Sequence, residues 1–212
     1  DGVIELNQTL LEAIEARFAF VADGIALKLD STNAESLRGL HKQQLILVQE
    51  DSAGIVISAT AVQMAGAMDA LYPAAAEIQN YGAVISANST QFKLWAPTAQ
   101  RVSVCHYADG KGKALAADAM AFDSVTGAWS LTKAGDLSGK YYTYLVDVFA
   151  RSAGLVRNRV TDPYSVSLTA DSKRSYIADL NSPALKPAQW DQPWISTKVK
   201  HQTDMSIYEL HV

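Results

Sequence analysis

The chain has 212 residues, of which 49% are hydrophobic and 19% are charged, and its formal net charge at pH 7 is −4. No apolar run approaches the roughly 18–20 residues that a membrane span needs, so the composition is typical of a soluble globular chain with one large or two small domains. The negative net charge gives no electrostatic reason to expect nucleic acid or an anionic membrane as a partner.

Charge divides the sequence into two parts. Residues 1–88 carry 11 acidic and 4 basic side chains, whereas residues 89–212 carry 11 acidic and 14 basic ones. A weakly patterned stretch also follows Tyr72-Pro73, as a linker would. We therefore predict domains at 1–88 and 89–193 and a last segment at 194–212. The opening DGVIELNQ has no initiating Met and no signal-peptide pattern, and we expect a cut or processed start.

The first part mixes one predicted helix with strands. Thr9 and Glu12 have the spacing of a capping box, and Leu10, Ile14 and Phe18 recur every four residues, which predicts a helix over 10–17. Alternating or continuous apolar runs predict strands at 25–29, 45–48 and 54–58. Because a Glu50–Ala53 turn separates the last two, they are expected to form a hairpin.

The second part is more clearly β. Alternating or aromatic-rich runs predict strands at 92–95, 101–107, 128–132 and 141–149. Turn signals stand between them at Asp109-Gly110, Thr126-Gly127 and Ser138-Gly139. Short strands at this spacing are typical of an antiparallel β-sandwich, so the fold class is all-β.

A search for catalytic or metal-binding motifs assigns no site residue. The chain has no glycine-rich phosphate loop and no Gly-x-Ser-x-Gly sequence. Its single cysteine, Cys105, lies in an alternating strand and is expected to be a buried, inert thiol, and no cysteine cluster can bind zinc. The four histidines are scattered without metal-ligand spacing and are expected to be structural or solvated: His41, His106, His201 and His211.

A tryptophan can be a core residue or a sugar platform, since exposed aromatic faces stack on pyranose rings. Trp95 and Trp129 lie on predicted strands, and core packing is the expected role of both, more firmly for Trp95. Trp190 and Trp194 lie in the proline-broken segment PALKPAQWDQPWIS.

Four segments resemble known sequences in one order. FKLWAPTA at 92–99 closely resembles the opening of the family-48 carbohydrate-binding module, GKYYTYLV at 139–146 resembles its late strand, and VTDPYS at 160–165 resembles its closing motif. MSIYELHV at 205–212 is similar to the first strand of the catalytic (β/α)8 barrel of debranching enzymes. Residues 58–72 and 164–180 are most similar to type I bacterial pullulanases of the secreted Klebsiella kind.

This resemblance implies two tandem Ig-like antiparallel β-sandwiches followed by the first strand of an otherwise absent (β/α)8 barrel. It implies the non-catalytic N-terminal portion of an extracellular or cell-surface hydrolase that cleaves α-1,6-glucosidic bonds in pullulan, starch and branched dextrins. The implied partners are the catalytic barrel of the same enzyme and its α-glucan substrate. The catalytic carboxylates of the family lie on later barrel strands, so none falls on this chain and Glu209 is not catalytic. Calcium is common in the family, but the chain has no loop of the EF-hand type.

One departure from the family affects sugar binding. Glycogen-binding relatives of the module carry two platform tryptophans and a lysine, whereas here residues 108–118 and 149–163 contain no Trp, and Thr143 stands at the lysine position. The module is therefore expected to position the barrel and not to hold glucan itself. The alternatives are a free-standing glucan-binding protein, an Ig-like structural or adhesion module, and an isoamylase or branching enzyme.

Overall fold

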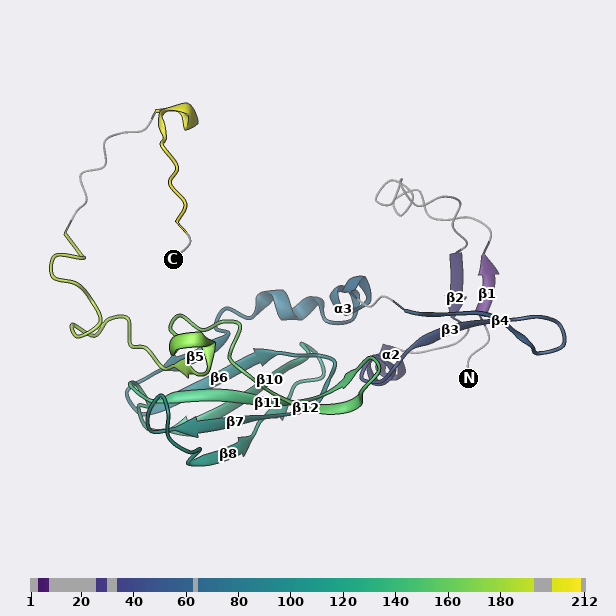
Figure 1. The fold of residues 1–212 in the computed structure, drawn as a ribbon, viewed down its shortest axis with the longest axis horizontal. Helices are drawn as coiled ribbons and strands as arrows, with labels where there is room; N and C mark the ends of the chain where they lie inside the picture. Colours follow the sequence, from purple (N-terminus) through teal and green to yellow (C-terminus); the bar gives the residue numbers. More distant parts are fainter. Residues whose placement is uncertain (1–3, 8–25, 30–33, 63–64, 193–199, 211–212) are drawn as a thin grey trace. The chain divides into compact units, whose positions relative to one another are not determined.

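The computed structural model describes residues 4–7, 26–29, 34–62, 65–192 and 200–210, and the chain divides into two compact units, Asp1–Ile177 and Ala178–Val212. The first unit contains the sandwich, whose strands are drawn from blue-green to light green in Figure 1.

Two antiparallel sheets form the sandwich. One sheet has the order β5-β6-β10-β9, and the other has the order β12-β11-β7-β8, with a short β13 also paired to β11. The strands are β5 Gly82–Ile85, β6 Ser89–Trp95, β7 Ala99–Tyr107, β8 Ala116–Ala119, β9 Ala121–Phe122, β10 Ala128–Ala134, β11 Tyr141–Ala150, β12 Gly154–Val160 and β13 Ser175–Tyr176. The all-β prediction and the four strands predicted for this part are confirmed.

The core lies between the two sheets and follows from alternation along the strands. In β6, Phe92 and Leu94 are buried while their neighbours are partly exposed, because successive side chains point to opposite faces. Phe92 meets Tyr142 of β11 edge to face, with ring centroids 5.0 Å apart. Val102 and Val104 of β7 complete the centre of this core.

The sandwich begins earlier than the predicted boundary between 88 and 89. β5 pairs with β6 from Gly82↔Lys93 to Ile85↔Thr90, so the first sheet already includes residues of the predicted first domain. The charge asymmetry could not locate this start, because β5 carries no charged residue.

The described residues before Gly82 form two separate strand pairs and short helices. β1 Ile4–Asn7 pairs with β2 Ala26–Leu29, and β3 Ile46–Glu50 pairs with β4 Val56–Ala61. The predicted hairpin is thus confirmed, and Asp51 closes its turn by accepting from the backbone N–H groups of Ala53 and Ile55.

A complete first sandwich stays a prediction, and the predicted helix at 10–17 lies outside the described residues. The structure also contains three short helices that the sequence did not indicate: α2 Ala34–Leu40, α3 Ala65–Leu71 and the 3₁₀ helix η1 Pro73–Glu77.

Short turns make up most of the remainder. A single 3₁₀ turn, η2 Ala170–Ser172, precedes β13, and η3 Gln202–Asp204 lies in the second unit. Residues 205–210 have no sheet partner among the described residues, and Ile207 is 90% exposed. Their assignment to a barrel strand stays a prediction, since a strand needs a neighbour to pair with.

An ion pair across β11 and β12 gives a pH prediction. Arg157 donates from Nε and Nη2 to the two carboxylate oxygens of Asp147 at 2.6 and 2.7 Å, and these bonds hold the pKa of Asp147 below its usual value. A lowered folded-state pKa stabilises the fold above the unfolded pKa of about 3.9, and this contribution is lost as the pH falls through the lowered value.

We therefore expect the urea midpoint of the wild type to exceed that of Asp147→Asn near neutral pH, with the difference shrinking below about pH 4. Asp171→Asn, which removes an exposed carboxylate, is the matched control. A difference between wild type and Asp147→Asn that stays constant down to acid pH would contradict the assignment.

Candidate functional site

The loop at 108–118, which contains no tryptophan, is held against the sandwich by Arg174. The Arg174 guanidinium carbon lies 3.8 Å from the centre of the Tyr107 ring. The same guanidinium donates hydrogen bonds to the carbonyl oxygens of Asp109 and Gly112. The loop is therefore tied down by two hydrogen bonds from Arg174, which also makes a cation–π contact with Tyr107.

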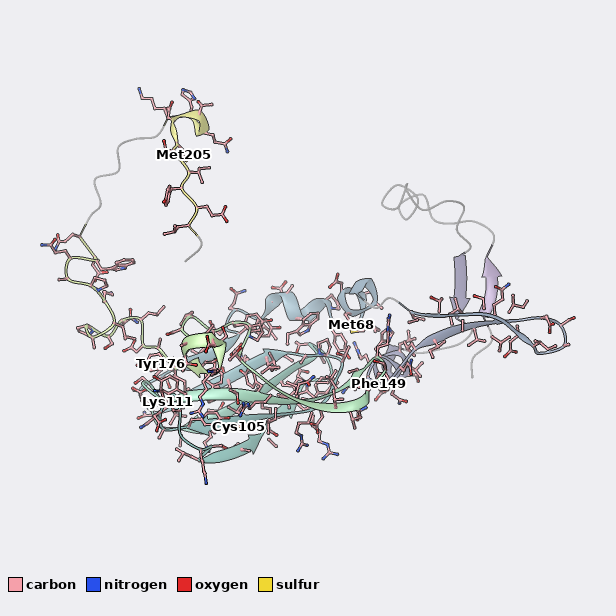
Figure 2. The ribbon with its side chains drawn as sticks, viewed as in Figure 1. Met68, Cys105, Lys111, Phe149, Tyr176 and Met205 are labelled. Carbon is pink, nitrogen blue, oxygen red and sulfur yellow. The ribbon has the colours of Figure 1, made fainter. Side chains whose placement is uncertain are left out.

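Thr143, which the resemblance places where a lysine is expected, has a side chain too buried to reach a ligand. It is 1% exposed, and its hydroxyl lies 3.1 Å from the Tyr107 hydroxyl in a buried hydrogen bond. The neighbouring Cys105, labelled in Figure 2, is also buried, and burial raises the pKa of its thiol. The predicted burial of the cysteine is confirmed.

The closing Asp-Pro-Tyr motif is anchored by a buried carboxylate. Oδ2 of Asp162 accepts hydrogen bonds from the hydroxyls of Tyr142 at 2.7 Å and Tyr144 at 3.0 Å. Its Oδ1 accepts from the backbone N–H of Tyr164 at 2.8 Å, which fixes the turn that follows. Burial raises the pKa of Asp162, although the hydrogen bonds from Tyr142 and Tyr164 oppose this effect. The motif is thus a structural clamp that sets the position of Tyr164.

The tryptophans differ from expectation in one case. Trp129 is buried in the core cluster, as predicted, and its Nε1 donates to the Ala96 carbonyl. Trp95, predicted to be a core residue, is only half-buried and lies outside that cluster, because it shares the outer face of β6 with Lys93. Trp190 is 70% exposed, and Trp194 lies outside the described residues.

Trp95 borders a shallow hollow of about 390 Å³ that is open to solvent. We call this the aromatic hollow, and its lining consists of Asp69, Tyr72, Pro73, Ala75, Ala76, Tyr81, Trp95 and Tyr164. Tyr81 and Tyr164 stack there with ring centroids 4.7 Å apart and planes 13° apart. No local sequence pattern predicts this grouping, because its four aromatic residues are spread between positions 72 and 164.

The histidines form no common site in the described residues. Nδ1 of His41 lies 2.7 Å from the Leu37 carbonyl oxygen, and Nε2 of His106 lies 3.1 Å from Oδ2 of Asp118. Burial lowers the pKa of His106. His201 is exposed, and His211 lies outside the described part. Within the residues that the structure describes, no three His, Cys, Asp or Glu side chains are grouped to hold a metal ion.

None of the helices in the described ranges has the length and apolar character needed to cross a membrane. 

Comparison with known families identifies two domains. Residues 1–70 match the Pullulanase N2 domain, and residues 80–165 match Carbohydrate-binding module 48, also described as the isoamylase N-terminal domain. These ranges lie on either side of the Tyr72-Pro73 stretch.

Individual relatives agree with the family matches. The chain is 37% identical over 218 aligned residues to a pullulanase of Klebsiella pneumoniae, covering 100% of this chain and 20% of the relative. It is 34% identical to the chloroplastic Pullulanase 1 of Arabidopsis thaliana, covering 83% of this chain and 18% of the relative. The crystal structure of the Klebsiella pneumoniae pullulanase complexed with maltotriose matches with a TM-score of 0.79 and 37% identity, over 89% of this chain and 18% of that one. The chain therefore spans about a fifth of the length of these relatives.

Proposed function

Since the chain belongs to the Pullulanase N2 and family-48 carbohydrate-binding module families and is homologous to the N-terminal region of pullulanases, we propose that it is the non-catalytic part of a debranching enzyme. That enzyme hydrolyses α-1,6-glucosidic bonds in pullulan, starch and branched dextrins. The observation that carries the proposal is 37% identity to a pullulanase over the whole chain, with both N-terminal domains in order.

Within that enzyme, the proposed role of the chain is to support and position the catalytic barrel. Two features favour support over glucan capture at the family's usual face. The residue at the lysine position, Thr143, is buried, and the loop that lacks its tryptophan is held down by Arg174. Arg174 covers the Tyr107 ring and Thr143 is buried, so neither of these two residues offers a stacking surface to a sugar.

The proposed partners follow from the homology to the N-terminal region of pullulanases. They are the remaining domains of the same enzyme and, for the whole enzyme, an α-glucan. An extracellular or cell-surface location is proposed from the similarity to the Klebsiella enzymes. The plant relative, in contrast, is named chloroplastic. Fractionation of the native host tests the proposed location: the chain should be detected in the medium or the membrane fraction, and detection in the cytosol alone would contradict it.

The chain incubated alone with pullulan is expected to release no reducing sugar above the buffer level. A retaining glycosidase needs two carboxyl groups about 5–5.5 Å apart on either side of the scissile bond, and the family supplies them from later barrel strands. The measurement is a reducing-sugar assay on the purified chain, with Glu209→Gln as the control variant, which should behave like the wild type. Turnover that follows the chain through purification and falls in Glu209→Gln would contradict the non-catalytic role.

Sequencing the gene beyond codon 212 tests membership of the larger enzyme. A (β/α)8 barrel occupies about 250 residues, with alternating strand and helix patterns. A continuation without such a pattern would overturn the proposed function, whatever the chain binds.

A further inference from the structure

We propose that the aromatic hollow is a carbohydrate-binding site that takes a short segment of α-glucan. The hollow shares no lining residue with the surface at Tyr107 and Thr143, and it combines residues 69–76 with residues of the module. The proposal that the ligand is an α-glucan rests on the proposed function. The proposal that the ligand is a neutral sugar rests on the hollow itself.

The aromatic rings of the hollow are held in place before any ligand arrives. Trp95 donates from Nε1 to the Thr126 carbonyl at 2.9 Å, and the Tyr81 hydroxyl donates to the Ala75 carbonyl at 3.2 Å. The backbone N–H of Tyr164 donates to Asp162. Trp95 and Tyr81 are thus held by side-chain hydrogen bonds, and the Tyr164 ring is held by its stacking on Tyr81. Tyr72, the fourth ring, is only 2% exposed and forms the floor of the hollow. A ligand would not have to order these rings, and this lowers the entropic cost of binding.

A glycine permits the close approach of the stacked tyrosines. Gly82, next to Tyr81, has φ +85°, and a Cβ there would lie 3.2 Å from the Cβ of Tyr164 and 3.3 Å from its carbonyl oxygen. A side chain at this position would be strained and would push Tyr164 away from its partner. Tyr164 nevertheless remains 39% exposed, so the stacked pair borders solvent and is not sealed in the core.

The chemistry of the lining fits a neutral sugar. Aromatic rings bind the apolar faces of pyranose rings, and polar groups at the edge bind the hydroxyls. Asp69 is the one charged residue among the eight that line the hollow, and it is exposed. A single carboxylate would repel an anionic ligand but would accept hydrogen bonds from sugar hydroxyls.

Size and openness set the expected affinity. The volume of about 390 Å³ lies within the range of about 300–1,000 Å³ that is usual for small-molecule sites. Because the hollow is shallow, a sugar would remain largely hydrated, and we expect a dissociation constant of about 1 mM for maltotriose.

The test is a titration of the 212-residue chain with maltotriose, followed by the tryptophan indole N–H resonances in ¹⁵N NMR spectra. The Trp95 resonance should shift with saturation, while those of Trp129 and Trp190 should not.

Tyr164→Ala should weaken binding about tenfold, the loss that one stacking contact of about 1.4 kcal/mol would give. Asp69→Ala, an exposed substitution that leaves the rings intact, should weaken binding severalfold. Trp190→Ala, far from the lining residues in sequence and exposed, is the matched control and should bind like the wild type.

Several results would overturn the proposal. These are a Trp95 resonance that does not move at about 10 mM maltotriose, unchanged affinity in both Tyr164→Ala and Asp69→Ala, and shifts confined to the residues around Arg174. A Trp95 resonance that shifts with N-acetyl-tryptophanamide but not with maltotriose would also overturn the proposal. It would identify the hollow as a binding site for an apolar protein side chain. None of these results bears on whether the gene continues into a barrel, so failure here is distinguishable from failure of the proposed function.

Discussion

Replacing Asp162 with alanine is expected to lower the free energy of unfolding of the sandwich by about 3–5 kcal/mol. The substitution leaves the hydroxyls of Tyr142 and Tyr144, both fully buried, without their acceptor. A buried donor that loses its partner costs about 1–3 kcal/mol, and the Tyr164 backbone N–H loses its partner as well. Urea denaturation followed by Trp129 fluorescence measures the change.

Two further variants separate the carboxylate's charge from its hydrogen bonds. Asp162→Asn keeps one acceptor oxygen and should lose less stability than Asp162→Ala. Because burial raises the pKa of Asp162 above its unfolded value, the charge opposes folding as the pH rises through the folded pKa. Asp162→Asn should remove this pH dependence. A loss below about 1 kcal/mol in Asp162→Ala would show that the two tyrosines find other partners.

The second large effect concerns Trp95 and Trp129, which are both predicted to be core residues but differ in burial in the structure. Trp129→Ala is expected to destabilise the sandwich by about 3–5 kcal/mol, because emptying a buried aromatic site leaves a cavity. Trp129 is 6% exposed and packs against Phe122, with ring centroids 4.9 Å apart. Trp95→Ala should cost only about 1–2 kcal/mol, since the half-buried Trp95 lines an open hollow and water can replace it.

Thermal and urea denaturation of the two single variants provide the comparison, with Trp190→Ala as an exposed reference that should change stability by less than about 0.5 kcal/mol. Equal losses of unfolding free energy in Trp95→Ala and Trp129→Ala would contradict the observed difference in burial and would indicate that Trp95 is a core residue.

The alternation of apolar and polar residues predicted most strands of the sandwich. The same alternation explains why Trp95 is not a core residue. Phe92-Lys93-Leu94-Trp95 alternates in a strand, and the buried residues of β6 are Phe92 and Leu94. Trp95 therefore lies on the same face as Lys93, which a strict reading of the period of two would have placed outward. Hydrophobicity alone misled the prediction, because a tryptophan next to a core strand need not point into the core.

Other features could not be predicted because they depend on tertiary contacts. α2 and α3 have only seven residues each, too few for a helical period to stand out. The aromatic hollow requires Tyr81 to meet Tyr164, and these residues are brought together by strand pairing and by the Asp162 turn. No local pattern marks such a pair, although the Asp-Pro-Tyr motif pointed to one of its members.

The order of strands in the second sheet has a consequence for synthesis of the chain. β7 and β8 form an early hairpin-like pair, but the other side of β7 must wait for β11, which begins only at Tyr141. At about 5–20 residues per second, a ribosome needs seconds to deliver that strand, far longer than the roughly 1–10 μs in which a hairpin forms. During this interval the open edge of β7 and its valines are unprotected, and a pause between codons 107 and 141 would extend the period in which nascent chains can associate.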